Sequence, residues 1–305
     1  MIRAFQPVLL HTALLQLHIH MAPTNPPTKK TVPNTTMMST SSKIVSTCLL
    51  TLMQAACLQA GTSVPTSSTE AAATISLESG APRPCLCLGA HAGSAEPFSV
   101  NVTAGYDSTF FCRGMDMGDD LWSATATLDW NLNESLVWTI SNRYLNVGET
   151  GFEENHLYTG LFYKAGALTI GPSARWYHNF QGGMLEDAYD LGLQAVCRVG
   201  PVNISGGYYY ETETEGHYFE LGASAPIKIT DRFSLVPAAE ISYTDGWMMP
   251  MAKGWNTVSL RLSAPLILTE NVSLIPWVGA NLPLEALEMH QNNKFAGGIA
   301  LSATF

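Results

Sequence analysis

The sequence predicts an all-β protein, a transmembrane antiparallel β-barrel of about twelve strands, on three observations. Downstream of residue 96, successive segments alternate apolar and polar residues with the two-residue period of a β-strand. The chain is 46% hydrophobic but only 13% charged, and no stretch reaches the roughly 18 apolar residues that a membrane helix needs. The chain ends on an aromatic residue, Phe305. Together these features are typical of a barrel that crosses a membrane with strands.

The segment before the strand pattern has no alternation of its own. Its first part is rich in Pro and Thr, and we predict that it is untranslated or disordered, with translation starting near Met37. Lys43 then precedes the apolar run 44–57, which is the layout of a secretory signal. A Ser-, Thr- and Pro-rich tract follows, which we expect to be disordered or removed. We predict that residues 1–36 are untranslated or disordered and that residues 37–60 are the signal segment. Residues 61–96 are then the tract that is disordered or removed, and residues 97–305 form the barrel.

The last segment shows the strand pattern most clearly. Phe295, Ile299, Leu301 and Phe305 lie on one face of this strand, whereas Lys294 lies on the other. The same pattern recurs along the chain, and several strands end in aromatic residues, as an interface belt requires. We predict strands at residues 98–106, 122–130, 136–143, 156–164, 168–177, 188–199, 202–211, 217–227, 233–243, 257–266, 273–281 and 294–305.

The connections between these strands alternate in length. Tight turns separate longer connections, and an even strand count places both ends of the barrel on the tight-turn side. Outer-membrane barrels have short periplasmic turns and longer extracellular loops, and we predict this arrangement here. The predicted long loops are residues 107–121, 146–155, 178–187, 212–216, 244–256 and 282–293.

An internal repeat supports the register of the later strands. Residues 223–237 and 262–276 both place a strand end, a Thr-Asp or Thr-Glu turn and a strand start in the same order. We interpret the two copies as successive periplasmic hairpins. Both copies contain prolines near the turn, where each proline removes a ladder hydrogen bond, so we expect bulges or strand ends there.

The charged residues indicate which face of each strand meets lipid. They fall opposite the more apolar face, and an Arg or Lys on the lipid side would cost about 2–4 kcal/mol at the bilayer midplane. A soluble barrel would have the inverse arrangement, which alternation alone does not exclude. The signal segment, the terminal Phe305 and the aromatic strand ends favour the membrane. The predicted lumen-lining residues are Arg143, Arg175, Asp190, Arg198, Glu211, Glu220, Glu240 and Arg261.

The predicted first long loop contains a motif. The string Tyr106-Asp-Ser-Thr-Phe-Phe-Cys-Arg-Gly-Met-Asp116 resembles the opening of the TorF-type family of porin-like barrels, which has an aromatic-Arg-Gly step between its first two strands. Arg113 and Gly114 match this step, although Cys112 stands where an aromatic residue is usual. The resemblance covers about a tenth of the chain and implies a porin-like bacterial outer-membrane barrel. If the resemblance is set aside, the simpler interpretation is that Arg113 pairs with a nearby loop carboxylate and that Gly114 relieves backbone strain.

The predicted long loops carry an excess of negative charge. From Glu96 onward the chain has 10 basic and 23 acidic residues, a formal charge of −13. Many of these carboxylates cluster in the connections, where they would concentrate cations at a low-dielectric mouth. The predicted acidic mouth consists of Asp116, Asp119, Asp120, Glu149, Glu153 and Glu154.

The sequence offers no catalytic or cofactor motif. The His-x-Ser-Asn arrangement of barrel phospholipases does not occur at His156, His178 or His217. There is no phosphate loop, dinucleotide fingerprint, metal-ligand spacing or basic patch for nucleic acid. We therefore expect no enzyme activity, cofactor, metal or nucleic-acid partner.

Two functions remain open at this point. The first is a porin-like channel for passive diffusion of small solutes, with a preference for cations, in the outer membrane of a Gram-negative bacterium. The second is a plugged structural or adhesive barrel whose acidic extracellular loops bind a partner, because the lumenal charges could equally line a pore or lock together as ion pairs. In both cases we expect contact with outer-membrane lipid and lipopolysaccharide, and recognition of Phe305 by the barrel assembly machinery.

Overall fold

The computed structural model describes residues 97–180 and 187–305. The predictions for residues 1–96 lie outside the described residues. No helix in the described ranges is long and apolar enough to cross a membrane. The elements are β1 (Phe98–Cys112), β2 (Met115–Asn133), β3 (Leu136–Val147), β4 (Phe152–Ala165), β5 (Leu168–Asn179), β6 (Ala188–Val199), β7 (Val202–Glu211), β8 (Gly216–Ser224), β9 (Ile227–Lys228), β10 (Ser234–Asp245), β11 (Lys253–Ser263), β12 (Leu266–Ile267), β13 (Val272–Pro283) and β14 (Lys294–Thr304).

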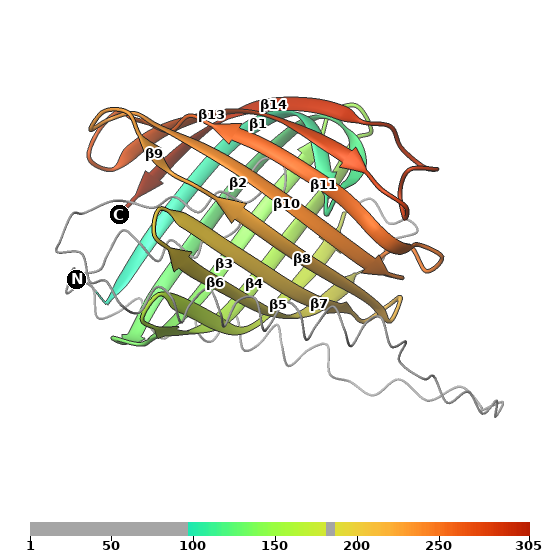
Figure 1. Cartoon of the computed structure of the whole chain (residues 1–305), viewed down its shortest axis with the longest axis horizontal. Helices are drawn as coiled ribbons and strands as arrows, with labels where there is room; N and C mark the ends of the chain where they lie inside the picture. Colours follow the sequence, from blue (N-terminus) through green and yellow to red (C-terminus); the bar gives the residue numbers. More distant parts are fainter. Residues whose placement is uncertain (1–96, 181–186) are drawn as a thin grey trace. The chain divides into compact units, whose positions relative to one another are not determined.

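The strands of the described ranges form one closed antiparallel sheet (Figure 1). Each long strand pairs with the next along the chain, and β1 closes the ring by pairing with β14 from Asn101↔Thr304 to Asp107↔Gly298. β9 and β12 have two residues each and pair only at the margins of β10 and β13, which leaves twelve strands in the ring. The prediction of a twelve-stranded antiparallel barrel is confirmed.

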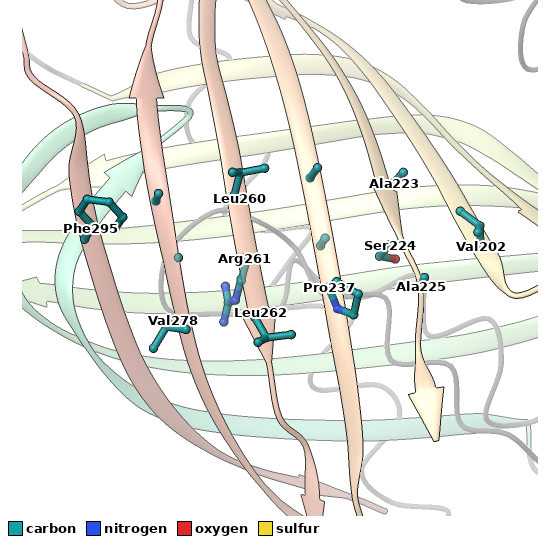
Figure 2. A pocket seen from close by; sticks show the side chains of 14 residues that line it. Val202, Ala223, Ser224, Ala225, Pro237, Leu260, Arg261, Leu262, Val278 and Phe295 are labelled. Carbon is teal, nitrogen blue, oxygen red and sulfur yellow. The ribbon is translucent and has the colours of Figure 1, made fainter. Parts of the chain in front are cut away.

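The outer face of the barrel is apolar and the inner face is polar, as a membrane requires. Along β11, Leu260 and Leu262 are 46% and 43% exposed on the outside, whereas Arg261 between them is 8% exposed and faces the lumen. The same alternation along β3 exposes Tyr144 and buries Arg143. Figure 2 shows a pocket on the outer face, lined mainly by small and aliphatic side chains. An apolar exterior around a polar interior identifies a transmembrane β-barrel.

Phe305 lies beside the seam of the barrel. Its amide donates to the Val100 carbonyl at 2.8 Å, and its carbonyl accepts from the Val100 amide at 3.0 Å. The residue is 71% exposed and shares the parity of Ile299 and Leu301, so it extends the lipid-facing row of β14. Its recognition by the assembly machinery stays a prediction.

The prolines of the internal repeat explain why two strands are split. Pro226 lies between β8 and β9, and Pro265 lies between β11 and β12. The amides beside them still pair across the sheet, since Ala225 donates to the Pro237 carbonyl at 3.1 Å and Ala264 donates to the Pro276 carbonyl at 2.9 Å. The two repeat copies therefore form equivalent hairpins with equivalent strand breaks, as the sequence predicts.

One predicted loop is wrong. Residues 107–121 were expected to form a long outer loop, but β1 continues to Cys112 and β2 begins at Met115, which leaves a two-residue turn. The connection between β3 and β4 is also shorter than expected, because β3 extends to Val147 and β4 begins at Phe152. Hydrophobic alternation located most of each strand, whereas the extensions add polar residues and, in the hairpin, consecutive apolar residues that pack on both faces and do not follow the alternation.

Candidate functional site: an inserted hairpin in the lumen

Residues 108–120, here called the inserted hairpin, leave the barrel wall. The pairing of β1 with β14 stops at Asp107, and the pairing of β2 with β3 starts at Leu121. Between these points β1 and β2 pair with each other as far as Cys112↔Met115. Hairpin side chains are buried, among them Phe110 at 1% and Cys112 at 6% exposure. The hairpin therefore folds into the barrel instead of standing in solvent.

The turn of the inserted hairpin requires a special backbone. Arg113 and Gly114 have φ angles of 47° and 84°, and positive φ at both central residues is typical of a type I′ turn, whose twist matches that of the flanking strands. A Cβ at Gly114 would also overlap the side chain of Thr257 on β11. Gly114 thus has both a backbone role, as predicted, and a packing role that no sequence pattern indicates.

The inserted hairpin is long enough to cross the lumen. Twelve strands about 4.8 Å apart and tilted by about 40° enclose a backbone ring roughly 24 Å across. The six steps along the strand from Asp107 to Arg113 extend about 20 Å at 3.3 Å per residue. In the order of the ring, β7 and β8 lie opposite β1 and β2, and Arg113 contacts both β7 and β8. The hairpin therefore enters the lumen beside β11 and β13, and the Arg113 side chain reaches from its turn to the opposite wall.

Arg113 ends in a cage of three aromatic rings and one carboxylate, and we call this assembly the tip cluster. Its guanidinium carbon lies 4.1 Å from the ring centre of Tyr209, 4.3 Å from that of Trp247 and 4.9 Å from that of Tyr218. Its Nη2 lies 2.7 Å from Asp190 Oδ2, and both side chains are 1% exposed. Cation–π contacts and a charge-assisted hydrogen bond both strengthen when water is excluded.

Further hydrogen bonds fix the backbone of the turn. Asn256 Nδ2 on β11 donates to the Arg113 carbonyl at 2.7 Å, and Asn281 Nδ2 on β13 donates to the Gly114 carbonyl at 2.8 Å. Gln291 Nε2 also donates to the Gly114 carbonyl, at 2.5 Å. Since a type I′ turn leaves its own carbonyls unpaired inside the lumen, these amides satisfy groups that would be costly to bury alone.

Apolar side chains pack on both faces of the inserted hairpin. Phe110 and Cys112 belong to a buried cluster that includes Leu121, Leu145 and Tyr177. On the other side, Phe111 packs with Trp277 and Ala296. Burying a side chain of the size of Phe stabilises by about 1.5–3 kcal/mol relative to exposure. The hairpin thus adds a hydrophobic core to an otherwise polar lumen.

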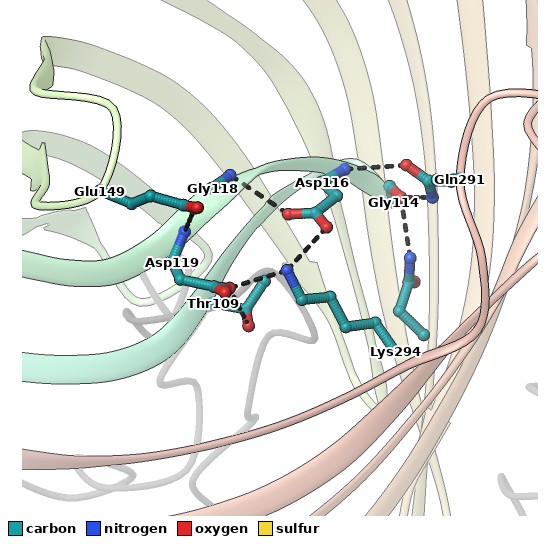
Figure 3. Close-up of polar contacts among 9 residues, drawn as sticks. Thr109, Gly114, Asp116, Gly118, Asp119, Glu149, Gln291 and Lys294 are labelled. Atoms are coloured by element: carbon teal, nitrogen blue, oxygen red, sulfur yellow. Dashed lines mark hydrogen bonds and ion pairs between the residues drawn. The ribbon is translucent and has the colours of Figure 1, made fainter.

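A second group of charges holds the hairpin where it leaves the wall, and we call it the base cluster (Figure 3). Lys294 Nζ lies 2.8 Å from Asp116 Oδ2 and 2.7 Å from Asp119 Oδ1. Thr109 Oγ1 donates to Asp119 at 2.8 Å, and the Asp119 amide donates to Glu149 Oε2 at 2.9 Å. Side-chain exposures of 27–44% leave this cluster accessible to water.

The base cluster lies at the loop end of the barrel, outside the lipid-facing band, and shifts two pKa values. Hydrogen bonds from Lys294 and Thr109 hold the pKa of Asp119 below its usual value. Partial burial disfavours the Lys294 ammonium, but its hydrogen bonds to Asp116 and Asp119 raise its pKa above the usual value. Both shifts keep the cluster charged near neutral pH.

The predicted lumen-lining residues all fall on the inward side of their strands, but they have different roles. Arg143, Arg175, Asp190, Glu220 and Arg261 are buried at 1–9% exposure. Each contacts an aromatic side chain or the inserted hairpin: Arg143 lies over Phe110, Arg175 over Tyr177, Arg261 over Trp277, Asp190 beside Arg113, and Glu220 accepts from Tyr209 Oη at 2.8 Å.

Of the other three predicted lumen residues, Glu211 and Arg198 lie at or near the ends of their strands, whereas Glu240 lies in the middle of β10. Glu211 accepts hydrogen bonds from the amides of Glu213 and Thr214 at 2.7 and 2.8 Å, so it fixes the turn after β7. Arg198 is exposed and donates to the Gly200 carbonyl at 3.3 Å. Glu240 is half-buried on β10. Sequence alternation therefore assigned the face of these residues, but it did not assign their depth.

The predicted acidic mouth is not a ring of unpaired carboxylates. Asp116 and Asp119 share Lys294, and Glu149 accepts from the backbone of Asp119. The other three have separate partners: Asp120 accepts from Tyr106 Oη at 2.6 Å, Glu153 accepts from Asn146 Nδ2 at 2.9 Å, and Glu154 lies 2.5 Å from His156 Nε2 inside the wall. The structure thus brings Asp116, Asp119 and Glu149 together and leaves the rest apart.

The inserted hairpin was missed although its sequence contains a signal. Phe110, Phe111 and Cys112 precede the turn, and Met115 and Met117 follow it. A loop in water gains nothing from so many large apolar side chains in ten residues, so their density indicates burial. The cage residues from β7, β8 and the connection after β10 carry no comparable signal, because each is one aromatic among many.

Comparisons with known proteins add little to this geometry. No family model matches the chain, and no curated protein resembles it in sequence, so the resemblance to the TorF-type family is not confirmed. Among the described residues, no group of three His, Cys, Asp or Glu side chains could hold a metal ion.

The solved structures to which this chain is similar include outer-membrane barrels. The KdgM porin in complex with disordered oligogalacturonate is 9% identical, with 68% of this chain and 99% of that chain covered and a TM-score of 0.46. The COG4313 outer-membrane channel from Pseudomonas putida F1 is 13% identical, with 70% of this chain and 98% of that chain covered and a TM-score of 0.44. The translocator domain of the autotransporter NalP from Neisseria meningitidis is 10% identical, with 89% of this chain and 100% of that chain covered and a TM-score of 0.45. Likenesses of this size carry no argument about function, which depends on the site itself.

Proposed function

We propose that this protein is an outer-membrane channel for small polar solutes, and that the inserted hairpin narrows its lumen. The observation that carries the proposal is that the barrel closes without the hairpin. The seam between β1 and β14 is paired from Asn101 to Asp107, below the point where the hairpin leaves the wall. The hairpin is therefore an addition to a complete ring. The barrel does not need it to close, but its position in the lumen obstructs the passage of solutes.

The lumen supports this proposal by its chemistry. Inward-facing Thr103, Thr125, Thr127, Thr139 and Ser141 are polar but uncharged, and they line neighbouring strands. Such a wall offers hydrogen bonds to a solute that has lost part of its water shell. The formal charge of −13 from Glu96 onward favours cations over anions. We place the protein in the outer membrane of a Gram-negative bacterium, surrounded by lipid and lipopolysaccharide, on the basis of its apolar exterior, which includes the exposed Phe305.

Conductance in a planar bilayer tests the proposal. In a shortened variant, an Asn-Gly turn replaces residues 108–120 and joins the paired residues Asp107 and Leu121, which suits a two-residue hairpin. We expect the wild type to conduct weakly and the shortened variant to conduct several-fold more, because the obstruction across the diameter is gone. Met251→Ala, at a 95% exposed position, is the control and should conduct like the wild type.

The inserted hairpin also favours a second candidate, a plugged barrel with a structural or adhesive role. A hairpin buried against the opposite wall at Tyr209 and Tyr218 could close the lumen permanently. The same recordings separate the two functions. An absence of conductance in both the wild type and the shortened variant, with both correctly assembled, would contradict the channel and support the plugged barrel.

A further inference from the structure

We propose that Asp190, Tyr209, Tyr218 and Trp247 form a binding site for a guanidinium-bearing cation, and that Arg113 occupies this site as an internal ligand. We call these four residues the cage. The inference deepens the proposed channel function by naming a class of solute that the lumen would recognise. It rests on the lumen being accessible to solutes, and the experiment below separates its failure from failure of the channel itself.

The cage has the chemistry that a planar cation requires. Three rings lie within 4.9 Å of the Arg113 guanidinium carbon, and one carboxylate oxygen lies 2.7 Å from its Nη2. Aromatic faces attract cations through the ring quadrupole, and the weakly hydrated guanidinium also stacks on them. The carboxylate supplies the counter-charge and one directional hydrogen bond.

The cage is held by contacts that do not involve the inserted hairpin. Tyr177 Oη donates to Asp190 Oδ2 at 2.6 Å, and Trp247 Nε1 donates to Asp190 Oδ1 at 3.0 Å. Tyr209 Oη donates to Glu220 at 2.8 Å. The connection that carries Trp247 is attached to β8 by the bridge between His217 and Gly246. The cage is therefore organised by β5–β8 and this connection, and we expect it to persist when Arg113 is absent.

Removing Arg113 would take away the cation that contacts the buried Asp190 carboxylate, which keeps hydrogen bonds from Tyr177 and Trp247 and has Arg175 as its cross-strand neighbour on β5. Such a group is costly in a site from which water is largely excluded, and a cation of matching shape relieves that cost. A solute that carries a guanidinium group would therefore compete with Arg113 for the cage. Because Arg113 is at the turn of the inserted hairpin, occupancy by the solute would also favour withdrawal of the hairpin from the opposite wall.

The test is chemical rescue of Arg113→Ala in the purified full-length protein. Methylguanidinium chloride is titrated in the millimolar range, and binding is followed by thermal stability and by tryptophan fluorescence, since Trp247 lines the cage. We expect a saturable response in Arg113→Ala, with half-saturation at least tenfold lower than in the wild type, where Arg113 competes. Sodium chloride at the same concentration should have no such effect.

Two matched variants make the test specific. Arg113→Ala combined with Asp190→Asn removes the counter-charge and should abolish the response. Arg198→Ala removes an exposed arginine at the other end of β6 and should behave like the wild type. If Arg113→Ala does not assemble, the shortened variant, which lacks Arg113 and the whole hairpin, takes the same titration.

A response that is absent in both variants lacking Arg113, or that survives Asp190→Asn, would overturn the cation site. Conductance distinguishes this result from failure of the channel. A shortened variant that conducts but does not respond to methylguanidinium would refute the site and leave the channel intact. A saturable response in a barrel that does not conduct would refute the channel and retain the cage.

Discussion

The tip cluster and the base cluster hold the same hairpin with ion pairs in opposite environments. At the tip, the side chains of Arg113 and Asp190 are both 1% exposed. At the base, Lys294, Asp116 and Asp119 have side chains that are 32%, 27% and 44% exposed. The distances are nearly equal, at 2.7–2.8 Å, so geometry alone does not rank them.

Burial decides the difference between the clusters. Two charges taken out of water are costly, and their attraction repays that cost only while both are present. Two charges at a wet surface lose little on pairing and little on separation. The tip cluster should therefore respond sharply to the loss of one partner, and the base cluster should respond weakly and in a manner that depends on salt. The predictions below test this ranking.

The largest effect is expected from Asp190→Ala. This change leaves the Arg113 guanidinium buried without its counter-charge, which costs about 3–5 kcal/mol in the free energy of unfolding. Urea unfolding of the barrel in lipid vesicles measures it. Asp231→Ala is the control, because Asp231 also pairs with a cation, Lys228, but its side chain is 94% exposed, and we expect no measurable change.

A double variant sharpens this first prediction. Arg113→Met with Asp190→Leu replaces the pair by apolar side chains of similar volume, and it should recover most of the lost stability because no charge is left unpaired. Equal stability of Asp190→Ala and the wild type would contradict the description of the tip as a dehydrated pair.

The next effect is expected from Gly114→Ala, which tests how tightly the tip is packed. A Cβ at Gly114 is strained by the φ of 84° and also overlaps Thr257, so the change should cost about 2–4 kcal/mol in unfolding free energy. Gly166→Ala is a matched control, because Gly166 has a φ of 62° but nothing within 4 Å of the added carbon. It should cost about 1–2 kcal/mol, from the backbone alone. Equal costs at both positions would mean that the tip is not seated against β11.

The smallest effect is expected from Lys294→Met. Loss of the base cluster should cost less than about 1 kcal/mol, and the difference from the wild type should shrink as salt increases, because the Debye length falls from about 10 Å at 0.1 M to about 3 Å at 1 M. Unfolding free energies at the two salt concentrations measure this. The cost of Asp190→Ala should change little over the same range, and a base cluster that is insensitive to salt would contradict the comparison.

The same variant has a predicted pH dependence. The folded pKa of Asp119 is lowered by Lys294 and Thr109, so its contribution to stability is present above the unfolded pKa of Asp. That contribution is lost as the pH falls through the folded pKa. The stability of the wild type and of Lys294→Met should therefore converge on acidification below about pH 4. Curves that stay parallel would exclude Asp119 as the group responsible.

Local sequence patterns located most of the barrel wall. Each of the twelve predicted segments overlaps a strand of the ring, because a strand that faces lipid on one side and a polar lumen on the other must alternate with a period of two. The same reasoning assigned Arg143, Arg175 and Arg261 to the inward face. It also recognised the repeated proline hairpins, because proline lacks the amide that a ladder position needs.

The sequence by itself determined the number of strands, their inward and outward faces and the seam at the C-terminal strand, since all three depend on residues near one another in the chain or on strict periodicity. The tertiary structure decided the rest. It placed the hairpin in the lumen, set the depth of Glu211 and Arg198, and paired Arg113. The sequence singled out Arg113 and Gly114, but it assigned Arg113 to a loop carboxylate. Its partner is Asp190, which lies 77 residues further along the chain. The flanking rings of Tyr209 and Tyr218 belong to β7 and β8, which lie six places around the ring from β1 and β2. Closure of the ring brings these groups within 5 Å of the Arg113 guanidinium and excludes the water that would otherwise screen their attraction.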